Sequence, residues 1–322
     1  MRRIVLTGLV AAALVLGAVP ASAVAAGPPN SGPPLSVSSN WLDQNLHCTG
    51  GAPDKATVLL LPGTTINTEE NFGWNYVQAF LLDERPVCTL DLPNRTMGDI
   101  QVAAEYVVAA IRAVHHQSGH KIAIVGHSQG GMIGRWALKY WPDTRGMVDD
   151  LIGMAPSNHG TDMAELLCNP DCAPAIWQQR TSAAFIRALN TGPETWPGTS
   201  YTVIYSHDDG IIVPPEASKL TTGYGQIANV ATSDACPGHN PDHLSLGTYD
   251  PVTYALVTDA LNHPGPASLD RFDPAACTQF TQPGVNQEFF AVNGARAFAA
   301  VAGTMLFTPH VPSEPKLAPY AR

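Results

Sequence analysis

The sequence is poor in charge and has no excess of basic residues. Asp, Glu, Lys and Arg make up 14% of the 322 residues, and 17 basic residues stand against 27 acidic ones. Nucleic-acid binding needs clustered Lys and Arg, so the formal net charge of −10 argues against that class of partner. The 28 Gly and 28 Pro residues follow no repeat period, which excludes collagen-like chains and repeat arrays. Apolar residues reach 45%, enough for a sizeable core.

Metal-binding signatures are missing as well. The chain has neither a Cys-x-x-Cys pair nor a His-Glu-x-x-His string, both of which are signatures of zinc sites. His115, His116 and His120 cluster at the end of an expected helix, where interaction with the helix dipole is the simpler interpretation. We therefore expect neither a metal nor an organic cofactor.

Long apolar runs are limited to the N-terminus. Two arginines precede an apolar run over residues 4–19, and Ala-Ser-Ala follows at residues 21–23. This pattern predicts a secretory signal peptide over residues 1–23, with Ala26 as an alternative cleavage position, and a flexible lead-in over residues 24–40. The run is shorter than the ~20 apolar residues of a membrane span, and we expect no later segment to cross a bilayer. The protein is expected to be secreted and extracellular.

Six cysteines in an exported chain indicate disulfide bonds. Cys168 and Cys172 are four residues apart around an Asn-Pro-Asp turn, which predicts a local bridge. Spacing alone leaves three possible pairings among the other four cysteines, Cys48, Cys88, Cys236 and Cys277.

Strands and helices are expected to alternate with short connections. That pattern predicts right-handed crossovers, an α/β fold with a mostly parallel sheet, and helices on both faces. No linker interrupts it, so residues 41–322 are interpreted as a single domain. The expected strands cover residues 57–61, 87–92, 121–125, 148–155, 201–206 and 227–231, and the expected helices cover residues 99–118, 130–140, 178–189 and 252–261.

The strongest local signal is the string Gly126-His127-Ser128-Gln129-Gly130, between an expected strand and an expected helix. This is the Gly-x-Ser-x-Gly elbow in the context that supports it. The turn is so tight that it needs small residues on both sides of the nucleophile, and the helix N-terminus favours the anion formed on attack. We interpret Ser128 as a nucleophile.

A serine hydroxyl needs a base to remove its proton and a carboxylate to orient that base. On this fold the chain order is serine, then the acid, then histidine. The expected strand 201–206 leads into Asp208 and Asp209. Asp209, directly before Gly-Ile, is the better candidate, and Asp208 is the alternative.

Four histidines follow these carboxylates in the chain. His243 comes after the last expected strand and before the last core helix, where this fold carries its base. His239 is the alternative. His263, at a helix end, and His310, in a Pro-rich segment, are interpreted as surface residues.

The tetrahedral intermediate needs two hydrogen-bond donors. One is expected from the backbone N–H of Gln129, the residue after the nucleophile. The other is expected from the loop after the first strand, where Thr64 is the natural candidate.

With these residues in place, the chain resembles the Candida antarctica lipase B family of the α/β-hydrolase superfamily over nearly its whole mature length. The resemblance implies an α/β-hydrolase fold, a triad of Ser128, Asp209 and His243, and oxyanion donors at Thr64 and Gln129. The strings that carry it are Leu-Leu-Leu-Pro-Gly-Thr at 59–64, Ser-Gln-Gly-Gly at 128–131, Trp-Gln-Gln at 177–179, Asp-His at 242–243 and Leu-Ala-Pro-Tyr-Ala-Arg at 317–322.

The resemblance also implies two disulfides, Cys48 with Cys88 and Cys236 with Cys277. Two positions depart from the family pattern. His127 stands where the fungal enzyme carries a Trp, and Ser157 replaces an acidic residue near the active site.

These observations predict a secreted serine ester hydrolase that forms an acyl-enzyme, and a triacylglycerol lipase is the first choice. A short-chain carboxylesterase or polyester hydrolase with the same triad is the alternative. We expect a monomer that acts on lipid or ester substrates at a lipid–water interface. The Ala- and Phe-rich stretch 289–302 is expected to form either a wall of the acyl pocket or a plain core helix.

Overall fold

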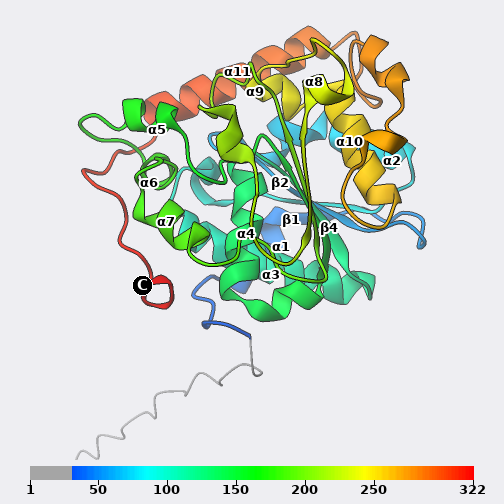
Figure 1. The fold of residues 1–322 in the computed structure, drawn as a ribbon. Helices are drawn as coiled ribbons and strands as arrows, with labels where there is room; N and C mark the ends of the chain where they lie inside the picture. The colour runs from blue at the N-terminus through cyan, green and yellow to red at the C-terminus, as the bar shows by residue number, and fades with distance from the viewer. Residues whose placement is uncertain (1–30) are drawn as a thin grey trace, which may run out of the picture.

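The structure is a computed structural model that describes residues 31–322. The expected signal peptide over residues 1–23 and the first part of the expected lead-in lie outside the described residues. Figure 1 shows a central sheet with helices on both sides.

Seven strands form one sheet, with the spatial order β1-β3-β2-β4-β5-β6-β7. Edge strand β1 pairs with β3 in the antiparallel direction, and the other neighbours are parallel. The expected α/β fold with a mostly parallel sheet is confirmed. The strands are β1 (Leu46–Cys48), β2 (Val58–Leu61), β3 (Val87–Leu90), β4 (Ile122–His127), β5 (Val148–Met154), β6 (Ser200–Tyr205) and β7 (Gln226–Ala231).

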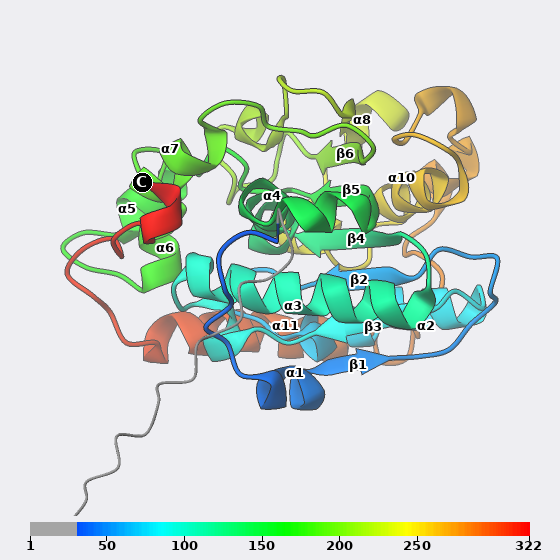
Figure 2. The same cartoon turned by 90° about the horizontal axis from the view of Figure 1, so that it is seen from below.

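Both faces of the sheet are buried, which explains why its inner strands are continuous apolar runs. In β2, Leu59 and Leu61 pack with one apolar cluster, while Val58 and Leu60 pack with the other, as the two-residue period of a strand requires. Figure 2 shows α3 and α4 lying against one face. Helices α3 (Ile100–Ser118), α4 (Gln129–Tyr140) and α7 (Ala184–Asn190) cover the first face, and α2 (Tyr76–Leu82) and α10 (Pro251–Asn262) cover the second.

Helix ends follow local signals in the sequence. Asp99 caps α3 by accepting a hydrogen bond from the N–H of Gln101, and Gly119 ends the helix with a left-handed φ of 75°. Asp250 caps α10 in the same way through the N–H of Thr253. These ends lie within one residue of the expected ones.

The expected helix over residues 178–189 was wrong. The structure has α6 (Pro174–Gln178) and α7, separated by a turn. The turn forms because Thr161 donates its backbone N–H to the carbonyl of Gln179 and pairs with Arg180 as an isolated bridge. A contact with a distant segment thus replaces the helical hydrogen bonds. The other short helices are α1 (Ser39–Asn45), α5 (Asp162–Leu167), α8 (Thr232–Ala235) and α9 (His243–Leu246).

Helix α11 (Phe290–Phe307) overturns one expectation and decides between two alternatives for its own role. Its 18 residues have a mean hydropathy of 1.3, which is long and apolar enough for a bilayer, so the expectation that no later segment could cross one was wrong by that measure. It is not a plain core helix either, because Ala297 is its one buried residue. Figure 1 shows α11 running across the top of the molecule, with α5 near one end.

All six cysteines are paired, so the described residues hold no free thiol. The local bridge and the two long-range bridges join the residues that were expected to pair. The disulfides are Cys48–Cys88, Cys168–Cys172 and Cys236–Cys277.

One buried carboxylate on β5 predicts a pH-dependent stability. Burial, helped by the neighbouring charge of Asp149, raises the pKa of Asp150 from 3.8 to about 7. Since the folded state holds the proton of Asp150 more tightly than the unfolded state, the contribution of this group to stability is largest below about pH 4 and is lost as the pH rises through 7. Asp150→Asn is therefore expected to stabilise the protein by about 1–3 kcal/mol at pH 8.

Thermal unfolding of both proteins at pH 4 and pH 8 checks this prediction. The stabilisation should shrink at pH 4, while Asp43→Asn on the exposed face of α1 should change little at either pH. An equal effect of Asp150→Asn at both pH values would contradict the prediction.

Candidate active site

The elbow joins β4 to α4 through a strained residue. Ser128 has φ 55° and ψ −123°, an unusual conformation for a residue with a side chain, and α4 begins at Gln129. Backbone strain of this kind persists where the surrounding structure imposes it, and it is the conformation expected of a nucleophile elbow.

Two glycines make the elbow possible. A Cβ on Gly126 would lie 2.2 Å from the carbonyl oxygen of Gly130, and a Cβ on Gly130 would lie 2.1 Å from the carbonyl oxygen of Leu61. Neither position can accept a side chain. The second contact also brings the loop that follows β2 against the elbow, so the expected oxyanion loop and Ser128 lie side by side.

The structure brings Asp209 and His243 together. Both carboxylate oxygens of Asp209 lie 2.9 Å from Nδ1 of His243, and the backbone N–H of His243 donates to the carbonyl of Asp209 at 3.0 Å. The carboxylate also accepts the N–H groups of Ile211 at 3.0 Å and Ile212 at 2.6 Å. The loop after β6 and the start of α9 are therefore held by both side chain and backbone.

Asp209 is only 3% exposed, so its charge needs compensation. Burial alone would raise the pKa of Asp209. The charge and hydrogen bond of His243, together with the two backbone N–H groups, outweigh burial and hold that pKa below its ordinary value. The carboxylate is thus ionised near neutral pH and orients the Nδ1–H of His243.

The alternative residues lie in other environments. Asp208 is exposed, unlike its neighbour Asp209. His239 pairs with Asp250, the cap of α10, and does not line the cavity that holds Ser128. Two further histidines have partners of their own on the outside of the molecule: His263 pairs with Asp259, and His310 pairs with Asp171.

The histidine cluster at the end of α3 contributes to the helix end. Nδ1 of His115 lies 2.8 Å from the backbone carbonyl of His120, and His116 is exposed. Within residues 31–322, no group of three His, Cys, Asp or Glu side chains is arranged to hold a metal ion.

Two amides converge on the hydroxyl of Thr64. Its Oγ1 accepts hydrogen bonds from Nε2 of Gln129 at 3.2 Å and from Nε2 of Gln179 at 3.0 Å. Ser157 donates to the other end of the Gln179 amide at 2.8 Å, so the serine that replaces an acidic residue keeps this amide oriented. Because both amides donate to Oγ1, the hydroxyl hydrogen of Thr64 remains available to another acceptor. Sequence reasoning did not assign Gln179 a role, although it lies in the family string Trp-Gln-Gln.

Ser128, Asp209 and His243 line one cavity of about 460 Å³, together with Thr64. His127 lines the same cavity. Much of the remaining lining is apolar and comes from α5, the loop after β6 and α11, with Met163, Ala164, Leu167, Ile211, Ile212, Phe298, Val301 and Met305.

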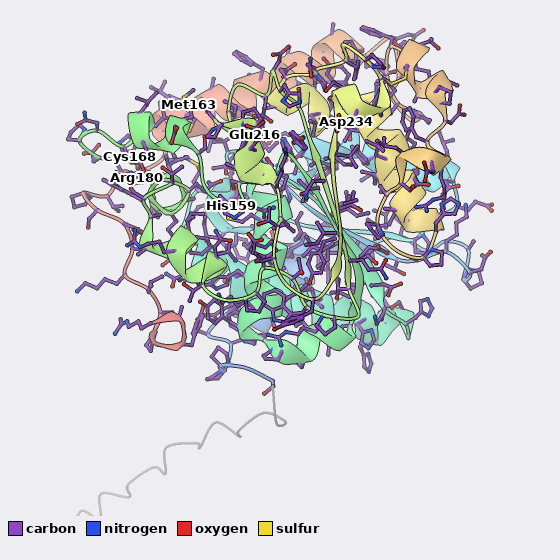
Figure 3. The ribbon with its side chains drawn as sticks, viewed as in Figure 1. His159, Met163, Cys168, Arg180, Glu216 and Asp234 are labelled. Atoms are coloured by element: carbon purple, nitrogen blue, oxygen red, sulfur yellow. A yellow bond between two sulfur atoms is a disulfide. The ribbon has the colours of Figure 1, made fainter. Side chains whose placement is uncertain are left out.

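One part of the cavity lining comes from α5, which is anchored at both ends. Thr161 caps the helix by accepting the N–H of Met163, and the same Oγ1 accepts the N–H of Val213 at 3.0 Å. The Cys168–Cys172 bridge follows its last turn. Figure 3 shows Met163 and Cys168 at this helix with Arg180 beside them, and Arg180 forms an ion pair with Glu165 of α5.

Comparison with known proteins agrees with this architecture. The chain matches the alpha/beta hydrolase family over residues 58–284. It is 30% identical to lipase B of Pseudozyma (Candida) antarctica in an alignment of 289 residues that covers 87% of this chain and 84% of the relative.

Solved structures give the same result. The crystal structure of Aspergillus fumigatus lipase B has a TM-score of 0.81 at 30% identity, covering 91% of this chain and 74% of that one. The mature form of Bacillus licheniformis lipase BlEst2 is a more distant neighbour, with a TM-score of 0.52 at 17% identity, covering 63% and 92%. The chain therefore belongs to the alpha/beta hydrolase family, as a homologue of the lipase B enzymes.

Proposed function

We propose that this protein is a secreted triacylglycerol lipase in which Ser128 is the nucleophile, His243 the base and Asp209 the acid. Its family and its lipase homologues make it a carboxylic ester hydrolase. One observation carries the finer proposal: a buried, ionised carboxylate orients an imidazole on the same cavity wall as a serine held at a strained elbow.

The first step is attack of Ser128 on the ester carbonyl. His243 accepts the hydroxyl proton at Nε2, because Asp209 holds the hydrogen on Nδ1 and so leaves the other nitrogen free. The same carboxylate stabilises the imidazolium that forms.

The developing oxyanion needs donors that are already in place. The N–H of Gln129 is the first of its helix and has no intrahelical acceptor. The hydroxyl of Thr64 is the second donor, because the amides of Gln129 and Gln179 both donate to its oxygen and leave its hydrogen for the substrate.

The intermediate then collapses to an acyl-enzyme. The bond between the carbonyl carbon and the alcohol oxygen breaks, and the alcohol leaves with the proton from His243. Water repeats the sequence: His243 takes a proton from water, hydroxide adds to the acyl carbon, and Ser128 leaves with that proton. No redox step or cofactor is required.

The apolar lining of the cavity suits an acyl chain, and the surface around its mouth suits a lipid–water interface. Several large apolar side chains of α5 and α11, the two helices that supply much of the apolar lining, are exposed to solvent. Their exposed fractions are Leu166 74%, Phe298 68%, Leu306 75% and Phe307 81%.

Secretion is part of the proposal and rests on two observations. The N-terminal sequence has the pattern of a signal peptide, and the described residues contain three disulfides, which form in oxidising compartments.

Ser128→Ala tests the nucleophile. We expect kcat/KM to fall by about four orders of magnitude, because the remaining groups cannot form the acyl-enzyme, while the melting temperature changes little. The same change at Ser118, at the end of α3, should leave activity intact. Labelling of wild type by a fluorophosphonate at a residue other than Ser128 would rule out the assignment.

Asp209→Asn and Asp208→Asn form a matched pair for the acid. The first is expected to lower kcat by about 10³–10⁴-fold, because an amide cannot hold His243 in the right tautomer or stabilise its charge. The second removes only an exposed charge and should leave kcat within about twofold. Equal effects of the two substitutions on ester turnover would contradict the choice of Asp209.

Val301→Trp tests the acyl pocket. A larger side chain on the lining should shift the preference from long to short acyl chains, measured as kcat/KM over a series of glycerol esters. Val292→Trp is the control, since Val292 lies on the same helix but outside the lining. If wild type hydrolyses soluble short esters but not dispersed long-chain triacylglycerol, the protein is a short-chain esterase instead.

A further inference from the structure

Helix α9, which carries His243, has only four residues. Such a short helix has almost no stability of its own, so its position depends on groups outside it. Asp242 caps its N-terminus through the N–H groups of Leu244 and Ser245. The N–H of Gly247 donates to the carbonyl of His243 at 3.3 Å, and side chains from other elements add hydrogen bonds to the carbonyl groups of His243 and Gly247.

Asn71 satisfies one of them. This residue is fully buried in the π-helical turn Glu69–Gly73, and its Nδ2 donates to the carbonyl of Gly247 at 3.0 Å. Its Oδ1 accepts the N–H of Gly63 at 3.0 Å. With the amide flipped, its NH2 group would face the N–H of Gly63 and its oxygen would face the carbonyl of Gly247. The two partners therefore set the orientation of the amide. One amide thus joins the end of α9 to the loop that precedes Thr64.

His127 satisfies another. Its Nε2 lies 3.0 Å from the carbonyl oxygen of His243, and the two imidazole rings lie 4.7 Å apart between centroids. A carbonyl only accepts, so Nε2 carries the hydrogen. Burial, helped by the neighbouring His243, lowers the pKa of His127 to about 3, so the ring is neutral at working pH.

The ring of His127 also has little room to move. A Cβ on Gly247 would lie 2.2 Å from its Cδ2, and a Cβ on Gly63 would lie 3.1 Å from its Nδ1. Oδ1 of Asn71 lies 3.3 Å from the same Nδ1. Because a neutral ring with its hydrogen on Nε2 has a bare Nδ1, this last approach is a packing contact.

We propose that Asn71 and His127 are positioning residues, which hold the base-bearing helix α9 at a set distance from the nucleophile elbow and the oxyanion loop. The inference rests on the proposed function, because it assigns these side chains a role through His243. His127 precedes Ser128 directly, and so links the nucleophile to the base by one residue. Asn71 links the base to the oxyanion loop by one amide.

His127→Leu removes the N–H and the ring while keeping the site apolar. The carbonyl of His243 then keeps only the longer hydrogen bond from the N–H of Gly247, and the imidazole loses its packing surface, so fewer molecules hold the base in the attacking arrangement. On a soluble short-chain ester we expect kcat to fall by about 10–100-fold with KM within about twofold. His127→Gln restores a donor and should recover most of kcat, while His116→Leu on the surface should change nothing.

Asn71→Asp provides an independent test of the same network. It keeps the acceptor for Gly63 but loses the donor to Gly247, so kcat should fall with little change in KM. This variant keeps the inference testable if His127→Leu fails to fold, as judged by circular dichroism.

Labelling by a fluorophosphonate separates the possible failures. If wild type is not labelled at Ser128, the proposed function fails. If wild type is labelled and the folded His127→Leu and Asn71→Asp proteins react at the same rate as wild type, the positioning role is overturned. The positioning role is also overturned if kcat of His127→Gln is as low as kcat of His127→Leu. It is likewise overturned if the losses of kcat in the variants only follow their drops in melting temperature.

Discussion

The buried carboxylate of Asp209 is tolerated because three N–H groups meet it, the Nδ1–H of His243, which lies 2.9 Å from both oxygens, and two backbone N–H groups. Removing a single charge from water costs several kcal/mol unless such partners repay it. The same contact holds α9 to the loop after β6, so the burial of the acid and the placement of the base are one constraint. The rest of the site depends on that constraint.

The other half of the site lies around the elbow and the π-helical turn, where backbone segments approach each other closely. Gly126 lets the elbow turn closely on itself, Gly130 lets the end of β2 reach it, and Gly63 and Gly247 leave space for the ring of His127. Closely packed backbone groups therefore surround the strained residue Ser128 and leave it little freedom. Such rigidity is what a preorganised oxyanion site requires.

The environment of helix α11 could not be predicted from its sequence pattern. Its apolar composition suited both a core helix and a pocket wall, because composition does not say what a helix packs against. The structure leaves it at the surface with one buried residue, Ala297, and places Phe298, Val301 and Met305 on the cavity. The break between α6 and α7 was missed for a similar reason, since the bridge from Thr161 to Arg180 joins segments that local propensity does not relate.

The amino-acid pattern alone was enough to predict the alternation of strands and helices, the extent of the helix that ends before Gly119, and the elbow at Ser128. These signals arise from backbone preferences and hydrogen bonds within a few residues. The packed fold was needed to show that Asp209, not Asp208, is buried against His243, and that Asn71 reaches Gly247, 176 residues away. Such contacts depend on how the sheet and its loops pack, and the free energy of that packing is spread over the whole chain.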